Sequence, residues 1–203
     1  MPEMPEQSLG CELEKDYNPD MATKTLMTVD QFLLLPDEEL RRHELWQGEL
    51  VEVGETILNH NLIRDELVYS VRYFLRRHNL GGQAVAETGI QFDSITLSRP
   101  DVAYWDAEHL ASIDKNRSPV EIMPQLLAEV VSPSNSLSEL FRKAEFFLRC
   151  GVQVVWVVDR DPLEIHVFEK GKARRVVHLG ELLEAPSVLP GYSENTSRFV
   201  PPA

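Results

Sequence analysis

Apolar residues recur at helical spacing in two long segments of the chain. In residues 58–78, positions 63, 67, 71, 74 and 75 are apolar, and mostly polar side chains lie between them. A second such segment ends near Arg149, and Ser136 or Ser138 can cap its start. Because a spacing of three and four residues puts apolar side chains on one face, both segments are predicted to be amphipathic helices. Gly81-Gly82 is expected to end the first one.

The segment before the first long helix shows shorter signals. Thr28 can cap a short helix that ends before Pro36, and residues 37–42 suit a further helical turn. Apolar and polar residues then alternate over residues 43–53, on either side of Gln47-Gly48. A glycine in the middle of such an alternation is typical of a β-hairpin.

Strand-like segments follow the first long helix. They are residues 83–92, 101–105, 126–131, 152–159, 163–169 and 174–178. The nearly continuous apolar run at 152–159 suits a central strand that is covered on both faces. The last two segments alternate around Gly171 and are expected to form a closing hairpin. The pattern predicts a mixed α/β (α+β) fold, in which helices flank a central mixed β-sheet and an N-terminal helix and β-hairpin precede it.

The pattern also divides the chain into three parts. Residues 1–25 lack apolar periodicity and contain six acidic residues against two lysines, so they are expected to be a disordered acidic arm. Residues 26–192 are expected to form one domain, and residues 193–203 a C-terminal tail. Internal repeats are not visible in the sequence.

Composition narrows the class of protein. Hydrophobic residues make up 43% of the chain, which is enough for a core, and the formal net charge is −13. A charge of this sign argues against a protein that coats nucleic acid non-specifically. Two distant cysteines give neither a disulfide framework nor a zinc motif. Without a signal pattern or a membrane-length apolar stretch, the expected location is the cytoplasm.

Two acidic residues lie within apolar strand sequence. Asp101 precedes Val-Ala-Tyr-Trp, and Glu129 lies inside Leu-Leu-Ala-Glu-Val-Val. A buried carboxylate is costly unless it pairs with a cation or binds a metal. Each acid could therefore pair with an arginine or lie at a strand end. Two such acids that face one point would instead favour a hard divalent cation such as Mg²⁺.

An ordered set of short motifs connects these acids to a known family. The set is Glu44-Leu45-x-x-Gly48, His60, Arg99-Pro100-Asp101-Val102-Ala103, Glu129-Val130-Val131-Ser132-Pro133-Ser134, Lys143, Gly151-Val152 and Trp156-Val157-Val158-Asp159. Pro100-Asp101 followed by Glu129-Val130-Val131 is similar to the PD-(D/E)xK nuclease pattern. The whole set resembles the Uma-two family of restriction endonucleases over about residues 28–192. This resemblance implies a restriction-endonuclease-like core.

The resemblance also implies roles for individual residues. Asp101 and Glu129 would hold Mg²⁺, which Mn²⁺ could replace, and the backbone carbonyl of Val130 would be a further ligand. Glu44 would bind the metal directly or through water. Lys143 would supply the catalytic cation. A metal held in this way lowers the pKa of an attacking water and neutralises charge on the phosphate.

The chain departs from the superfamily pattern at two positions. The superfamily lysine, two residues after the second acid, is replaced by Val131, so the cation is expected to come from the following helix through Lys143. The alternative is that Lys143 is a solvated surface residue. Phe147 stands where tyrosine is more usual, which removes a hydroxyl group from this helix.

Further residues have both a functional and a structural interpretation. His60 could contact phosphate or position water, or it could stabilise the start of the helix. Ser132, Ser134 and Asn135 could bind phosphate, although capping of the helix is the simpler interpretation. Four arginines of the first long helix could face DNA or form a solvated face: Arg64, Arg72, Arg76 and Arg77. Trp46, Trp105 and Trp156 are interpreted as core or interface aromatics.

Three functions remain open from the sequence. The leading hypothesis is a Mg²⁺-dependent endonuclease that hydrolyses phosphodiester bonds in DNA. The second is a catalytically weak or inactive protein that kept the fold as a binding or assembly module. The third is a nuclease for RNA or branched DNA. A homodimer is expected, with the closing hairpin as its interface, whereas an organic cofactor and a membrane partner are not expected.

Overall fold

The structure is a computed structural model that describes residues 26–54 and 56–201. In chain order its elements are α1 (Val29–Phe32), α2 (Asp37–Arg42), β1 (His43–Trp46), β2 (Glu49–Glu52), α3 (Leu58–Arg77), β3 (Gln83–Ala86), β4 (Ile90–Asp93), β5 (Thr96–Ser98), β6 (Val102–Trp105), α4 (Ala107–Ala111), β7 (Leu126–Val130), α5 (Leu137–Arg149), β8 (Val154–Arg160), β9 (Leu163–Glu169), β10 (Arg175–His178), β11 (Leu182–Ala185), β12 (Leu189–Asn195) and the 3₁₀ helix η1 (Thr196–Phe199). None of the helices in these two ranges is long and apolar enough to cross a membrane.

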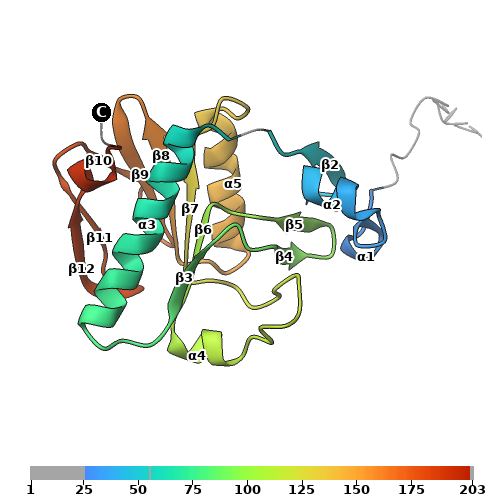
Figure 1. The fold of residues 1–203 in the computed structure, drawn as a ribbon, viewed down its shortest axis with the longest axis horizontal. Helices are drawn as coiled ribbons and strands as arrows, with labels where there is room; N and C mark the ends of the chain where they lie inside the picture. The colour runs from blue at the N-terminus through green and yellow to red at the C-terminus, as the bar shows by residue number, and fades with distance from the viewer. Residues whose placement is uncertain (1–25, 55, 202–203) are drawn as a thin grey trace, which may run out of the picture.

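A six-stranded sheet forms the centre of the molecule, with strand order β10-β9-β8-β7-β6-β3. β7 and β8 pair in parallel through the crossover helix α5, and the neighbouring pairs β6–β7 and β8–β9 are antiparallel. α3 crosses one face of this sheet, and α5 covers the other (Figure 1). The mixed sheet flanked by helices confirms the predicted fold class.

The alternation of side chains along β7 shows how the sheet separates two cores. Leu126, Ala128 and Val130 belong to the core on the α3 side. Leu127 belongs to the core on the α5 side. Because successive side chains of a strand point to opposite faces, Glu129 lies on the α5 side, like Leu127. The sequence therefore puts one acid among apolar residues on the face that α5 covers.

A second, four-stranded sheet has the order β2-β1-β5-β4. The hairpin predicted around Gln47-Gly48 is confirmed as β1 and β2, and both turn residues have positive φ, at 49° and 81°. This conformation suits a two-residue hairpin turn. A Cβ at Gly48 would lie 2.5 Å from the Cβ of Leu26, so the position requires glycine for space as well. This sheet holds β1 beside the central sheet.

The strand predicted over residues 83–92 is wrong as a single element. β3 pairs with β6 in the central sheet, whereas β4 pairs with β5 in the second sheet. Between them Glu87 has a φ of 50°, which turns the chain out of extended conformation. The short strand β5 was not predicted. A segment that passes from one sheet to the other can still have a continuous strand-like sequence.

Packed structure extends beyond the domain boundary expected at residue 192. That residue lies inside β12, which pairs with β11, and η1 follows it. Leu183, Tyr192 and Phe199 are buried in the core on the α3 side. The expected acidic arm at residues 1–25 lies outside the described residues. The closing hairpin predicted around Gly171 is confirmed as β9 and β10.

Candidate active site

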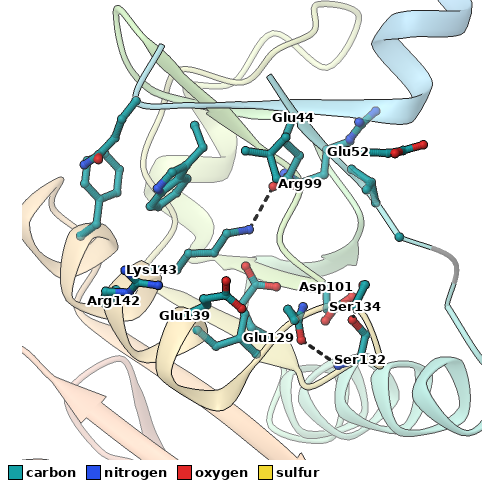
Figure 2. A pocket seen from close by; sticks show the side chains of 18 of the residues that line it. Glu44, Glu52, Arg99, Asp101, Glu129, Ser132, Ser134, Glu139, Arg142 and Lys143 are labelled. Atoms are coloured by element: carbon teal, nitrogen blue, oxygen red, sulfur yellow. Dashed lines mark hydrogen bonds and ion pairs between the residues drawn. The ribbon is translucent and has the colours of Figure 1, made fainter. Parts of the chain in front are cut away.

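A cavity of about 690 Å³ opens between α5, the β1–β2 hairpin and the first turn of α3 (Figure 2). Five predicted site residues line it: Glu44, His60, Asp101, Glu129 and Lys143. They come from β1, α3, the turn before β6, β7 and α5. Residues up to 99 positions apart in sequence therefore meet in one place.

Asp101 is held by two donors from different elements. Its Oδ2 accepts a hydrogen bond from the backbone N–H of Val130 at 2.7 Å and one from His60 Nε2 at 3.1 Å. The His60 side chain is 2% exposed. Burial opposes protonation of His60, but its hydrogen bond to Asp101 prevails and raises the pKa of the imidazole. His60 therefore orients Asp101 and compensates part of its charge.

Glu129 is buried without a partner for one of its oxygens. Its side chain is 7% exposed, and Oε1 has no hydrogen-bond partner. Burial raises the pKa of Glu129 to about 8; Lys143 opposes this increase, and the charges of Asp101 and Glu44 add to it. Asp101 and Glu44 are thus close enough to disfavour the ionisation of Glu129. A bound cation would relieve this repulsion.

Glu44 and Lys143 form a buried ion pair. Lys143 Nζ donates to Glu44 Oε2 at 3.0 Å, and the backbone N–H of Arg99 donates to Glu44 Oε1 at 2.6 Å. Burial alone would raise the pKa of Glu44, but the charge of Lys143 and the N–H donor outweigh it and lower the pKa. Burial likewise opposes the charge of Lys143, yet Glu129 and Glu44 raise the pKa of its ammonium group. Both members of the pair are charged at neutral pH.

α5 places Lys143 in the cavity. The helix begins with a capping box between Ser136 and Glu139, and Leu140, Ala144 and Phe147 pack against the sheet. Lys143 points along the side of the helix toward Glu44 (Figure 2). Its Nζ also lies 5.3 Å from the centre of the Trp46 ring. The lysine is therefore packed and paired inside the cavity, unlike a solvated surface lysine.

The donor chemistry fits a hard divalent cation, although the ligands are not preassembled. Within residues 26–54 and 56–201, no group of three His, Cys, Asp or Glu side chains is arranged to hold a metal ion. Asp101 and Glu129 nevertheless offer carboxylate oxygens to the same cavity, and the unpartnered Oε1 of Glu129 is a free acceptor. Oxygen donors of this kind suit Mg²⁺. Val130 contributes its N–H to Asp101, and a role for its carbonyl stays a prediction.

The serine-rich turn after β7 also reaches the cavity. Ser132, Ser134 and Asn135 line it, but they also bond to each other: Ser132 N–H donates to Asn135 Oδ1 at 2.8 Å, and the two serine hydroxyls lie 2.8 Å apart. These three residues therefore stabilise the turn through their own hydrogen bonds. Contact with phosphate stays a prediction.

The four arginines of α3, which could either face DNA or form a solvated face, do not reach the cavity. Arg64 is paired with Asp65 and Glu87, and Arg72 donates to the carbonyl of Ala84 at 2.6 Å. None of the four arginines is among the residues that line the cavity. These arginines are therefore not placed to contact DNA bound in this cavity.

Arg99 has a role that the sequence did not reveal. Its guanidinium donates to the carbonyls of Leu40 at 2.9 Å and His43 at 2.5 Å, while its backbone N–H holds Glu44. Arg99 thus ties the turn before Asp101 to the start of β1. The only sequence feature that could have indicated this role is the position of Arg99 directly before Pro100-Asp101 in the motif. Trp46 was interpreted as a core or interface residue, but it is only partly buried and lines the cavity.

The comparisons with known proteins concern the fold and the family. The fold is similar to that of a crystal structure described as a "putative nuclease belonging to DUF820 from Anabaena variabilis ATCC 29413", with a TM-score of 0.75 and 20% sequence identity. The alignment covers 86% of this chain and 97% of that one. A comparison with curated protein sequences found no match.

The fold and the cavity define a restriction-endonuclease-like protein. The Uma2 family, described as "Putative restriction endonuclease", matches residues 29–197. The chain therefore belongs to the Uma2 family, which confirms the resemblance inferred from the motifs. Family and fold together support a nuclease function.

Proposed function

We propose that the protein is a metal-dependent endonuclease that hydrolyses phosphodiester bonds in DNA at this cavity. The observation that carries the proposal is the buried, unpartnered carboxylate oxygen of Glu129, which lies among Asp101, Glu44 and the Lys143 ammonium. Buried charges are retained at such cost mainly where they have a function. Membership of the Uma2 family supports the reaction class.

Each residue has a distinct part in the proposed reaction. Asp101 and Glu129 would hold Mg²⁺, which when bound supplies activation of water and neutralisation of phosphate charge. His60 fixes the orientation of Asp101. Lys143 places a positive charge at the cavity, where it can stabilise the charge that develops on the phosphate. Glu44 holds Lys143 in position and is a further acidic group at the site.

The cavity shares the acidic bias of the whole chain. Its lining holds four basic side chains (Arg99, Arg142, Lys143 and Arg149) and seven acidic ones (Glu44, Glu49, Glu52, Asp101, Glu129, Glu139 and Glu145). Phosphate would therefore meet excess negative charge from the side chains of the site. Bound divalent cations would make this field more favourable to a phosphate backbone, which is a further reason to propose a metal-dependent reaction.

The test is cleavage of plasmid DNA and of a matched RNA with Mg²⁺ or Mn²⁺. We expect the DNA to be cut by the wild type, not by Asp101→Asn, and about 10²–10³ times more slowly by Lys143→Gln. Asp37→Asn, at an exposed position on α2, is the control and should retain activity. Intact DNA under all these conditions would refute the proposal, and cutting of RNA alone would change the substrate.

A non-catalytic binding module is the alternative. It is favoured by the lack of a preassembled metal site among the described residues and by Val131 in place of the strand lysine. Calorimetric titration with Mn²⁺ separates the two functions. We expect binding to the wild type that is lost in Glu129→Gln, whereas a module without a metal site would show the same weak signal in both.

A further inference from the structure

The outer face of α3 exposes a row of large apolar side chains. Exposed fractions are 38% for Leu62, 50% for Tyr69, 43% for Tyr73 and 46% for Leu80, which follows the helix. The rings of the two tyrosines stack, with centroids 5.9 Å apart. The inner face of α3 packs on the central sheet, whereas Figure 1 shows no helix or strand lying over its outer side. The Arg198 guanidinium of η1 lies over the Tyr69 ring, 5.1 Å from its centre, and the rest of this row remains an exposed apolar surface on an otherwise well-packed helix.

Charged residues lie on both sides of this row in a self-complementary order. Asp65 and Glu66 precede the tyrosines, and Arg76 and Arg77 follow them. Asp65 and Arg76 are separated by eleven residues, as are Glu66 and Arg77, which is close to three helical turns. Each acid therefore lies on the same side of the helix as one arginine, about 16 Å along the axis.

We propose that this face binds a second copy of the chain, with the two α3 helices antiparallel about a twofold axis level with Val71. In that register Tyr69 packs on Tyr73 of the second copy, and Leu62 packs on its Leu80. Rotation about the axis also brings each acid opposite the arginine on its own side. Asp65 meets Arg76 of the second copy, and Glu66 meets its Arg77. One register thus satisfies the apolar row and both charged flanks.

The charges on this face favour a second copy over nucleic acid as the occupant. Phosphate would meet Asp65 and Glu66 on the same surface as the arginines. A twofold axis instead pairs every acid with a base, as an isologous interface requires. Existing contacts leave these groups accessible. Asp65 pairs with Arg64 at 2.9 Å, but its side chain is 65% exposed. Glu66 lies 3.5 Å from Arg198, Arg77 donates to the Tyr73 hydroxyl at 3.3 Å, and Arg76 is exposed and has no ion pair with any residue in the described ranges.

The proposal is independent of the nuclease reaction, so its test measures association alone. Sedimentation equilibrium of the full chain over a wide concentration range should show a monomer–dimer equilibrium. Arg76→Glu sets like charges opposite Asp65 twice in each dimer, so the dissociation constant should rise about tenfold or more. The double variant Asp65→Arg/Arg76→Glu exchanges the charges and should restore the wild-type constant. Circular dichroism confirms that each variant is folded.

The control is Lys115→Glu, which makes the same change of charge at an exposed position in the loop after α4. It should leave the dissociation constant unchanged. The proposal is overturned if the wild type is monomeric at every concentration. It is equally overturned if Arg76→Glu dimerises like the wild type, or if the exchanged pair fails to recover association.

Discussion

Glu129 shows how one buried carboxylate couples the site to pH. Its pKa of about 8 is raised above the ordinary value of 4.5 by burial and by the charges of Asp101 and Glu44, against the effect of Lys143. The proton on Glu129 therefore stabilises the fold fully below pH 4.5. That stabilisation is lost as pH rises through about 8.

Glu129→Gln should remove this pH dependence. We expect the metal-free wild type to lose stability relative to the variant by on the order of 2 kcal/mol between pH 5 and pH 8.5, because the variant has no proton to lose. Urea unfolding across this pH range, with a chelator present, measures the difference. Glu38→Gln, at an exposed position of α2, is the control. Parallel curves for wild type and Glu129→Gln would contradict the prediction.

The proposed role of Lys143 can be tested with one variant that removes its charge and one that keeps the charge but changes the shape of the side chain. Lys143→Gln removes the cation from Glu44 and Glu129, so we expect the cleavage rate at saturating Mn²⁺ to fall by about 10²–10³. Lys143→Arg keeps the charge but changes the geometry, so its loss should be smaller. Lys170→Gln, at an exposed position, serves as the matched control. If Lys143→Gln were as active as this control, the lysine would be structural.

The sequence identified most of the residues at this site but not how they contact each other. Asp101 and Glu129 were recognisable because acids are rare in buried strands, and the family pattern singled out Lys143. The contact of His60 with Asp101 spans 41 positions and depends on where α3 lies on the sheet. Arg99 binds the backbone carbonyls of Leu40 and His43, and every residue has such a carbonyl, so the sequence does not indicate these contacts.

At the scale of elements, α5 connects core packing with the site. Phe147 is fully buried, and its ring centre lies 4.5 Å from that of Phe92 and 5.9 Å from that of Trp46. The same helix carries Lys143 on an adjacent side. Packing around Phe147 therefore helps to set the position of Lys143.

Phe147→Ala should destabilise the protein by about 3–5 kcal/mol, because it removes a buried ring and leaves a cavity. Urea unfolding at neutral pH measures this loss. Glu145→Ala, at an exposed position of the same helix, is the control and should change stability by less than about 0.5 kcal/mol. A loss below about 1 kcal/mol for Phe147→Ala would mean that α5 repacks easily.

Elements with strong periodicity were predicted well, and those that depend on tertiary pairing were not. α3, α5 and the β9–β10 hairpin follow directly from their apolar spacing. The division of residues 83–92 between two sheets depends on the turn at Glu87, whose positive φ is not encoded by a glycine. β11, β12 and η1 have many exposed polar residues, so only their packing identifies them as part of the domain: β12 and η1 contact α3, and β11 pairs with β12.

For the whole molecule, the positions of the cavity and of the α3 face determine how the proposed dimer would act. Glu129 and Lys143 enter the cavity from the α5 side of the central sheet, His60 enters it from the first turn of α3, and the outer face of α3 lies on the side of the sheet opposite to α5. In the dimer two helices, each about 10 Å across, separate the two sheets. The Glu129 side chains of the two copies then lie on the far faces of the two sheets, more than about 20 Å apart.

This arrangement predicts that a supercoiled plasmid is nicked before it is linearised. Two sites whose Glu129 side chains lie on the far faces of two sheets are not expected to cut both strands at one place in one encounter, so open-circular DNA should accumulate first and linear DNA should appear only after independent second cuts. A time course on agarose gels, with Mn²⁺, measures the order of the products. Arg76→Glu, monomeric under the proposal, should give the same order and a similar rate per site. Linear DNA formed from the start without an open-circular intermediate would require the two sites to face one another, and would contradict an interface on α3.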